Sequence, residues 1–452
     1  MKVYALTSSL ILSAFNVLAQ QHRDYDIVVV GGTSAGYSAA IQAARLNRTV
    51  ALLEMSKHVG GIAIEGAGAS DIDSQSAFQN SLTVGPLAFE FYRRVSARYN
   101  NTEAFDKAWS THTKDKNLWR FESHVGQSVI EEWMAEEPNL DVFLETALLG
   151  PGNGRGVTKS GATITMVRTE KNQTFSARYF IDATYEGDLL AAAAVSYVVG
   201  REPIAQYDEI LAGIQHNTTF SQFTVDIDPY LIPGDPSSGL IPTVQNQTLG
   251  MPGDGDHNNQ AFSWRLCLTN NHSNLVPFHY PDSYDRSQYE IYSRYSAAGG
   301  TIFTPSVVLP NNKTDIIGST SMGLGFDMPG RTLAYPEGSH QQRAKLFQEL
   351  AQWQKGLLYF LANDESLPEA VRNEWSQWGY ARDEFVDNDH FPRAMMYIPL
   401  DGLFEMDHSM MKDLSGKKDQ IGSRGSYPTE LLSQNLPNVG TFSSQHRPQA
   451  RT

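Results

Sequence analysis

The first residues whose types and spacing point to chemistry form a short glycine-rich run, Gly31-Gly32-Thr33-Ser34-Ala35-Gly36. The run follows an apolar, β-branched stretch at 27–30 and precedes an alanine-rich stretch, which indicates a turn between a buried strand and a helix. An acidic residue, Glu54, stands 23 positions after Gly31, at the tip of the next apolar stretch. A helix amino terminus offers free N–H groups to a diphosphate, and a carboxylate at this spacing accepts hydrogen bonds from a ribose. The pattern therefore predicts a dinucleotide site.

Individual positions of the run have distinct expected roles. Gly31 permits the tight turn, and Gly36 lets the helix pack closely on the strand. Thr33 stands where this fingerprint usually has its middle glycine. Its side chain must therefore point away from the phosphate, or the backbone approaches the phosphate less closely. A carboxylate at Glu54 disfavours a 2′-phosphate and argues against NADP. The alternative without a nucleotide is a glycine turn in an ordinary α/β protein.

Three further segments extend the predicted cofactor site. Gly60-Gly61 follows Glu54 closely, as is typical of FAD proteins of the glutathione-reductase type, and bare backbone there can pass close to a diphosphate or a flavin. Asp182-Ala183-Thr184 ends an apolar strand, and ligands bind beyond the carboxyl ends of strands in a doubly wound sheet. Leu148, at the end of another expected strand, is also predicted to contact the cofactor. The Gly60-Gly61 pair favours FAD over NAD.

Three residues are candidates for the chemistry itself. Glu186, in the loop after Asp182 and close to Asp188, could act as a general base or orient a hydroxyl, or it could cap the following helix. His124 could assist proton transfer, or pack at the start of a helix. Arg265 could bind an anionic substrate, or form a structural ion pair. No Ser/His/Asp signature and no metal-ligand spacing stands out, so we expect no metal.

Residues 182–202, which begin Asp-Ala-Thr-Tyr-Glu-Gly-Asp, resemble the FAD-dependent oxidoreductase family of secreted and bacterial proteins, some of whose members carry xanthan-lyase-like names. Val29-Val30-Gly31-Gly32-Thr33 is similar to that family too, in which threonine at this position is common. Further similar stretches are 121–125, 233–239 and 261–269, and the resemblance covers about residues 24 to 395. It implies an FAD domain completed by a segment near the carboxyl terminus that reaches under the flavin.

The carboxyl-terminal part departs from the family's pattern. After Phe391-Pro392-Arg393 the family has an arginine-rich segment, whereas this chain continues Ala394-Met395-Met396-Tyr397. Gly425-Ser426-Tyr427-Pro428 is family-like, but the glycine-rich, flavin-contacting segment expected beyond it is missing. We therefore expect a truncated chain, an incorrect gene model, or incompletely held FAD.

The elements that must position these residues follow from local pattern. Strands are expected at 27–30, 49–53, 142–148, 163–169 and 177–181, and helices at 35–46, 86–99, 123–135, 189–194 and 342–361. This order predicts an α/β fold with a glutathione-reductase-like Rossmann-type FAD-binding domain and an inserted mixed α+β substrate domain. The expected divisions are a signal peptide at 1–19, the FAD-binding domain at 20–202, the substrate-side domain at 203–340, a helical segment packing on the core at 341–400, and a degenerate or truncated segment at 401–452.

Composition excludes several classes of function. Of the 452 residues, 41% are hydrophobic and 19% charged, as in a globular protein with a sizeable core. The net charge of −15 repels phosphate backbones, so we expect no nucleic-acid partner. We also expect no membrane partner, because no later stretch reaches the ~20 apolar residues of a span. The single cysteine, Cys267, excludes intrachain disulfides, and the oligomeric state stays open.

The amino terminus has the features of a secretory signal peptide: Lys2, a mostly apolar stretch at 3–18, and small residues for cleavage after Ala19. Asn-x-Ser/Thr triplets, which accept N-glycans in secreted proteins, follow at Asn47, Asn100, Asn172, Asn217, Asn246, Asn271 and Asn312. Asn47 is the least favourable acceptor because it lies in a short turn.

These features predict a secreted, N-glycosylated FAD-dependent oxidoreductase that oxidises a small organic substrate by flavin-mediated hydride transfer. Secretion favours a carbohydrate or related polyol as substrate, and dioxygen as electron acceptor, because no NAD pool exists outside the cell. Two alternatives stay open. One is a polysaccharide-lyase-like enzyme, which would need a base and a charge neutraliser in a long open cleft. The other is a non-catalytic remnant that binds FAD poorly.

Overall fold

The computed structural model describes residues 22–69, 84–150, 156–210, 212–214, 223–246, 250–259, 261–317, 324–326 and 330–398. The predicted signal peptide, the triplet at Asn217, the segment 401–452 and its Gly425-Ser426-Tyr427-Pro428 run lie outside these residues.

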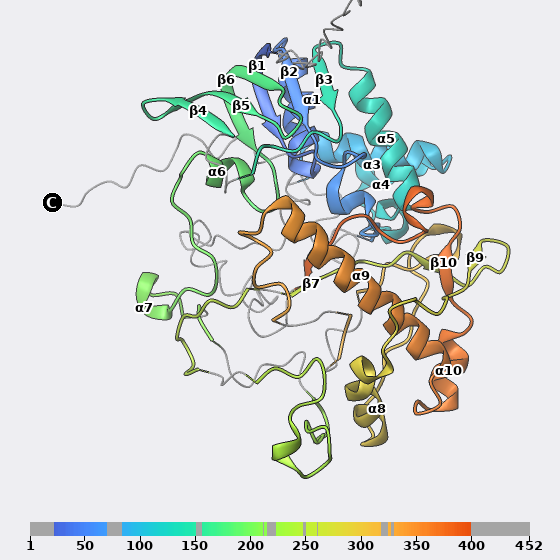
Figure 1. The fold of residues 1–452 in the computed structure, drawn as a ribbon. Helices are drawn as coiled ribbons and strands as arrows, with labels where there is room; N and C mark the ends of the chain where they lie inside the picture. The colour runs from blue at the N-terminus through green and yellow to red at the C-terminus, as the bar shows by residue number, and fades with distance from the viewer. Residues whose placement is uncertain are drawn as a thin grey trace, which may run out of the picture.

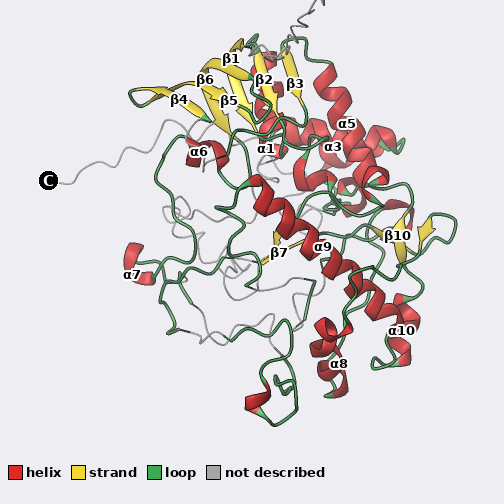
Figure 2. Cartoon of the chain, in the orientation of Figure 1, coloured by secondary structure: helices red, strands yellow, loops and turns green. Residues whose placement is uncertain are grey.

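A six-stranded sheet forms one end of the molecule, in the order β3-β2-β1-β6-β5-β4 (Figures 1 and 2). Its strands are β1 (His22–Val30), β2 (Val50–Leu53), β3 (Leu140–Phe143), β4 (Val157–Ser160), β5 (Thr163–Arg168) and β6 (Thr174–Asp182). The pairs β1–β2, β2–β3 and β1–β6 are parallel, whereas β4–β5 and β5–β6 are antiparallel. The α/β class with a parallel-dominated, Rossmann-type sheet is therefore confirmed.

The register of the central strands brings distant residues to one edge. Val30 pairs with Leu53 of β2 on one side and with Asp182 of β6 on the other. The carboxyl ends of these three parallel strands are thus level. The residues that follow them must emerge at the same edge of the sheet, where ligands bind in such folds.

Helices cover one face of this sheet. They are α1 (Ser34–Arg45), α3 (Pro86–Arg98), α4 (Thr102–Thr111) and α5 (Ser123–Ala135), with the short turns η1 (Gly61–Ile64) and η2 (Lys116–Trp119). Val29 and Leu52 pack against them in a hydrophobic cluster, whereas Val28 and Leu53 pack into a second cluster on the other face. Burial on both faces explains why the strands are continuous apolar runs.

The rest of the described chain lies around one long helix, α9 (His340–Asn363), which runs diagonally from the centre of Figure 1 toward the lower right. The other elements are α6 (Asp188–Ala192), α7 (Ile204–Tyr207), η4 (Pro236–Ser238), β7 (Ala261–Ser263), β8 (Leu268–Thr269), β9 (Leu275–Val276), η5 (Arg286–Tyr289), α8 (Glu290–Ala297), η6 (Pro310–Asn312), α10 (Glu369–Trp375), β10 (Gly379–Ala381), η7 (Val386–Asn388) and β11 (Met396–Ile398). Trp264, Tyr289 and Leu357 belong to its separate hydrophobic core.

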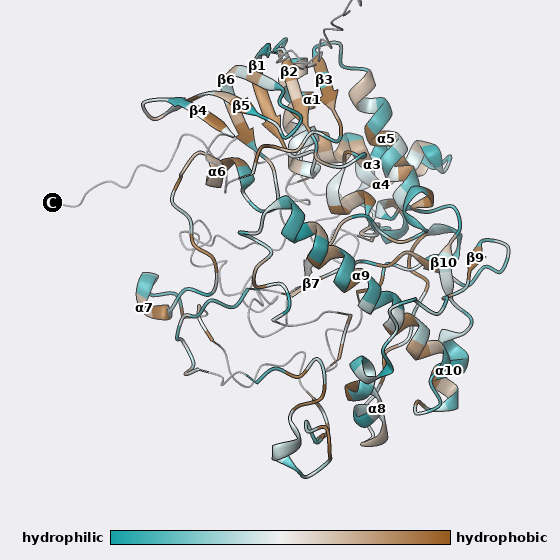
Figure 3. Cartoon of the chain, in the orientation of Figure 1, coloured by the Kyte–Doolittle hydropathy of each residue, from teal (hydrophilic) through white to brown (hydrophobic). Residues whose placement is uncertain are grey.

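Helix α9 confirms and extends the helix predicted at 342–361. It begins with a capping box, in which the Ser339 and Gln342 side chains satisfy each other's backbone N–H groups. Polar and apolar residues alternate along it in Figure 3, as expected for a helix with one buried face. Within the described residues, no helix has both the length and the apolar character required to cross a membrane.

Two expectations differ from the structure. The strand expected at 142–148 ends at Phe143, because Glu145 has a left-handed backbone (φ 50°) that breaks the strand, and Leu148 makes a single bridge with Thr169. The segment 341–400, expected to be helical, also contains strands. Its strand β10 pairs with β8 and β9, and β11 pairs with β7, so this segment completes small sheets begun in 203–340.

Candidate functional site

The glycine-rich run predicted to bind a dinucleotide forms the turn from β1 to α1, and its backbone is tightly packed. Gly31 has φ +97°, and a Cβ there would lie 2.7 Å from the Ala183 carbonyl carbon and oxygen. A Cβ on Gly36 would lie 1.8 Å from the Gly31 oxygen. Since real Cβ atoms do not approach backbone so closely, both positions require glycine for the turn and for close helix–strand packing.

Thr33 uses its side chain within the protein. Its hydroxyl donates to the Ala183 carbonyl oxygen at 2.7 Å and accepts from the Gly36 N–H at 3.3 Å, which makes Thr33 the N-cap of α1. The residue is 7% exposed. The threonine that departs from the glycine fingerprint therefore turns away from the space in front of the helix end.

The first turn of α1 retains unused hydrogen-bond donors. Among the described residues, no acceptor takes the backbone N–H of Ser34 or Ala35. These groups lie at the positive end of the helix dipole, where an anion is stabilised. Two directed amides at the carboxyl edge of a parallel sheet are what a diphosphate needs.

Glu54 is fixed beside this helix end by two backbone amides. Its Oε2 accepts from Gly32 N–H and its Oε1 from Ser56 N–H, both at 2.6 Å, and the residue is 8% exposed. A carboxylate oxygen can accept more than one hydrogen bond, so each retains capacity for a ribose hydroxyl. The predicted pairing of the glycine run with an acid on the next strand is thus present in the fold.

The predicted Gly60-Gly61 pair lies against the same turn. Gly60 N–H donates to the Gly32 oxygen at 2.7 Å, and the Ser34 hydroxyl donates to the Gly60 oxygen at 3.2 Å. Both glycines have positive φ, +142° and +59°. The structure therefore brings two glycine segments together in front of α1.

Asp182 organises the loop that follows β6. Its Oδ1 accepts from the Thr184 N–H at 3.0 Å and hydroxyl at 2.7 Å, and its Oδ2 accepts from Leu190 N–H at 2.7 Å. Its carboxylate thereby shapes the backbone at Ala183 and Thr184 that faces the glycine run. Leu148, by contrast, is 3% exposed in the core on the opposite face of the sheet, so only its backbone could reach a ligand.

Glu186 lies in this loop and has a strongly perturbed acidity. Burial raises its pKa to about 7; Arg343 opposes the rise and Asp188 adds to it. Asp188 is itself held by Arg343, whose Nη1 donates to Oδ2 at 2.9 Å. Both residues of this pair are buried, and His340 lies 3.7 Å from Asp188. A carboxyl poised near neutral pH beside a predicted ligand edge is a candidate acid or base.

The other two catalytic candidates lie elsewhere, on either side of Gly66. Gly66 N–H donates to the hydroxyl of Ser123, the neighbour of His124, at 3.0 Å, and a Cβ on Gly66 would lie 2.0 Å from the Arg265 oxygen. His124 and Arg265 thus lie near Gly66, in the segment that follows Gly60-Gly61 and η1, rather than at the amino-terminal end of α1.

Both of these side chains are engaged in ion pairs. His124 Nδ1 lies 2.9 Å from Glu384 Oε1, and this hydrogen bond raises the pKa of His124. Arg265 pairs with Asp315. These are the structural roles that the sequence left open beside the catalytic ones.

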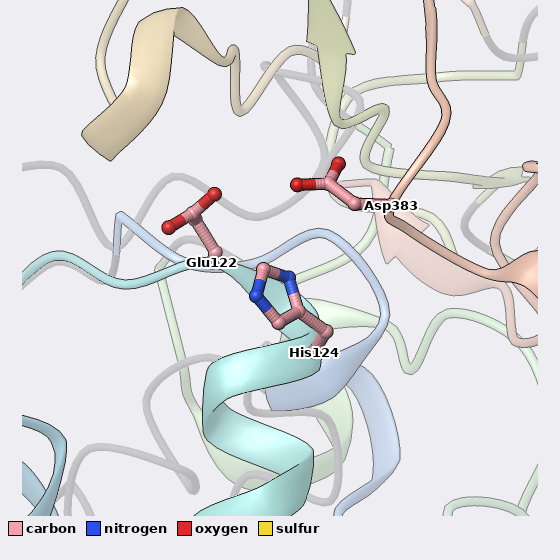
Figure 4. Close-up of side chains that lie close together, drawn as sticks. All are labelled: Glu122, His124 and Asp383. Atoms are coloured by element: carbon pink, nitrogen blue, oxygen red, sulfur yellow. The ribbon is translucent and has the colours of Figure 1, made fainter. Parts of the chain in front are cut away.

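Glu122, His124 and Asp383 come close enough to suggest a metal site, with one ligand atom of each within 4.8 Å of the others (Figure 4). Lys313, however, places its Nζ 2.6 Å from Glu122 Oε1 and 2.8 Å from Asp383 Oδ1. Because the ammonium already supplies a cation between these carboxylates, the group fits an ion cluster around the buried Lys313.

Sequence reasoning missed several residues that join the site to distant parts of the chain. Arg393 donates through its backbone N–H and Nε to Glu65, at 2.6 and 2.9 Å, and Tyr185 accepts from Ile62 N–H at 2.9 Å. Tyr185 and Arg393 stand inside runs that the resemblance singles out. Glu65 and Arg343 carry no local signal, because their partners are far away in sequence.

A comparison with protein families matches residues 26–397, most of the chain, to a family described as FAD dependent oxidoreductase. Among curated proteins, a vinyl phenol reductase of Lactiplantibacillus plantarum is 25% identical over 191 residues. That match covers 36% of this chain and 38% of the relative, so the chain spans well under half of the relative's length.

Two solved structures are similar over smaller parts of the chain. A thioredoxin reductase from T. acidophilum is 18% identical with a TM-score of 0.21, covering 35% of each chain. An L-amino acid deaminase from Proteus vulgaris is 15% identical with a TM-score of 0.28, covering 41% of this chain and 53% of the other. At these scores neither structure carries a functional argument, and the family match alone does.

Proposed function

Because the chain belongs to the FAD-dependent oxidoreductase family and has FAD as its cofactor, we propose that it oxidises a small organic substrate by hydride transfer. One observation carries this proposal. The free backbone amides of Ser34 and Ala35 and the Glu54 carboxylate lie at the same edge of the sheet. Free amides at a helix end and a neighbouring carboxylate are the groups that a dinucleotide cofactor needs for its diphosphate and ribose.

Some residues of the chain would bind FAD, and another would take part in the reaction. The Ser34 and Ala35 amides would bind the diphosphate, Glu54 would bind a ribose, and the Gly60-Gly61 backbone would lie alongside. When bound, FAD supplies the hydride acceptor. The remaining requirement is a group that removes the proton from the substrate hydroxyl.

Glu186 is the proposed proton acceptor. A carboxyl whose pKa is raised to about 7 by burial is substantially ionised at neutral pH and binds a proton well when the substrate releases it. Beside Glu186 lie the buried Arg343–Asp188 pair and His340, which is 3.7 Å from Asp188 and whose positive charge favours the ionised form of Glu186. His124 and Arg265 remain candidates for substrate contacts near Gly66, secondary to their ion pairs.

We also propose that the protein is secreted and N-glycosylated, with a carbohydrate or polyol as substrate and dioxygen as electron acceptor. Exposure of the predicted glycan acceptors supports the first part; Asn47, Asn100, Asn172, Asn246 and Asn312 are exposed. Expression in a glycosylating host, followed by endoglycosidase digestion, should lower the apparent mass of the secreted protein. An unchanged mass would contradict glycosylation.

The test of the proposed function is reduction of bound flavin. Mixing the holoprotein anaerobically with a panel of sugars and polyols should bleach the flavin absorption, and Glu186→Gln should slow bleaching ~100-fold, within the usual range for a lost general base. Flavin that every panel member leaves oxidised would contradict the proposed substrate class. Colourless protein that cleaves polysaccharide would favour a lyase, and colourless, inactive protein that takes up no FAD would favour a remnant.

A further inference from the structure

The Tyr185 hydroxyl joins two segments that the predicted cofactor site needs. It accepts a hydrogen bond from Ile62 N–H at 2.9 Å, across 123 positions of sequence. Ile62 belongs to η1, directly after the glycine pair, and Tyr185 belongs to the loop after β6. One hydroxyl thus ties the glycine turn to the loop that Asp182 shapes.

The packing around this hydroxyl leaves no space for a larger residue at Gly61. A Cβ on Gly61 would lie 2.1 Å from the Tyr185 Oη and 3.2 Å from the Thr33 Cα. The fingerprint turn, the glycine turn and the loop after β6 therefore converge at this point. Gly61 is needed there for its absent side chain as well as for its φ of +59°.

The surroundings keep the hydroxyl protonated. Burial raises the pKa of Tyr185 well above its usual range, and the carboxylates of Glu186, Glu54 and Glu65 raise it further. Among the described residues, no acceptor takes the hydroxyl proton. The Tyr185 hydroxyl therefore accepts one hydrogen bond from the glycine turn, and its O–H group can still donate one beside the candidate site.

We infer that Tyr185 is a positioning residue for FAD, which rests on the proposed function. Its hydroxyl fixes the glycine turn relative to the loop after β6. Without it, the Ile62 amide would lose its acceptor, while the Gly60–Gly32 and Thr33–Ala183 contacts would remain. The expected loss is therefore moderate: about tenfold in FAD affinity, the usual effect of one lost hydrogen bond.

The test compares Tyr185→Phe with Tyr289→Phe. Tyr289 is the control, because its hydroxyl also makes one hydrogen bond to backbone, to the Trp353 carbonyl oxygen at 2.9 Å, but lies in the core around α9; Tyr289 is buried, whereas Tyr185 is partly exposed. Tyr185→Phe should raise the Kd for FAD about tenfold and speed hydrogen exchange of the peptide containing Ile62 in the FAD-free protein. Tyr289→Phe should change neither, and thermal melts of both variants report on folding.

A second variant tests the contact itself. Gly61→Ala should weaken FAD binding in the wild-type background, but less so when Tyr185→Phe has removed the oxygen that lies 2.1 Å from the added carbon. Equal losses in both backgrounds, or a wild-type Kd for Tyr185→Phe, would overturn the inference and leave the proposed function standing. A wild-type protein that takes up no FAD would overturn both.

Discussion

The Thr33 hydroxyl donates to the Ala183 carbonyl oxygen at 2.7 Å, which joins two residues 150 positions apart. The same hydroxyl accepts from Gly36 N–H and so caps α1. A position where the dinucleotide fingerprint usually has glycine therefore carries two structural contacts. It connects the turn after β1 to the end of β6, and the free amides of α1 remain on the other side.

Replacement of Thr33 should separate these roles. Thr33→Ala removes both contacts and should lower the free energy of unfolding by about 1–2 kcal/mol, the usual cost of a lost N-cap. Thr33→Ser keeps a hydroxyl and should restore most of that stability. Urea unfolding measures both variants, and a Thr33→Ala protein as stable as the wild type would contradict the assignment.

Gly36 should tolerate no side chain. The Cβ of Gly36→Ala would lie 1.8 Å from the Gly31 oxygen, so α1 must shift away from the strand and the predicted diphosphate amides must move. We expect loss of FAD binding and at least ~1–3 kcal/mol of stability. Gly150→Ala is the control, because nothing lies within 4 Å of a Cβ there. Equal FAD titrations for the two variants would contradict this prediction.

The ionisation of Glu186 should produce one limb of the profile of kcat/KM against pH. Its pKa is raised to about 7, so the ionised form that accepts a proton increases as pH rises through 7, and kcat/KM should rise with it. Glu186→Gln should abolish this limb, whereas Glu103→Gln, on an exposed carboxyl of α4, should keep it. A limb that persists in Glu186→Gln would contradict the role.

The same shift has an opposite effect on stability. A carboxyl with a folded pKa above its unfolded value stabilises the fold fully at low pH, and this contribution is lost as pH rises toward about 7. Glu186→Gln should therefore be more stable relative to wild type at pH 8 than at pH 4. Urea unfolding at the two pH values measures the difference.

Lys313 should hold the ion cluster around it together. It is 0% exposed and pairs with the buried carboxylates of Glu122 at 2.6 Å and Glu384 at 2.8 Å. Lys313→Met removes the buried ammonium that pairs with these carboxylates and should cost about 3–5 kcal/mol in urea unfolding. Lys345→Met, which removes an exposed partner of Glu349, should change stability by less than about 0.5 kcal/mol. If the Lys313 variant were equally stable, the cluster would not depend on this ammonium.

Sequence pattern was sufficient where function depends on neighbours in the chain. The glycine run, the acid at Glu54 and the helix at 123–135 follow from local spacing, and the structure has them at those positions. The prediction that a strand ends at Leu148 was wrong, because the left-handed backbone of a single residue, Glu145, breaks an otherwise apolar pattern. Contacts across long sequence separations, such as Tyr185 with Ile62 or Arg393 with Glu65, depend on tertiary packing that no local pattern contains.

The most direct test of the account is FAD titration of the purified wild-type protein alongside Glu54→Gln. The account predicts that the wild type binds FAD with one site per chain. Glu54→Gln should bind it at least ~10-fold more weakly, because its amide cannot accept the Gly32 and Ser56 N–H groups through both Oε positions and also bind a ribose. A wild-type protein that binds no FAD, or a variant that binds it equally well, would contradict the placement of the cofactor at the end of α1.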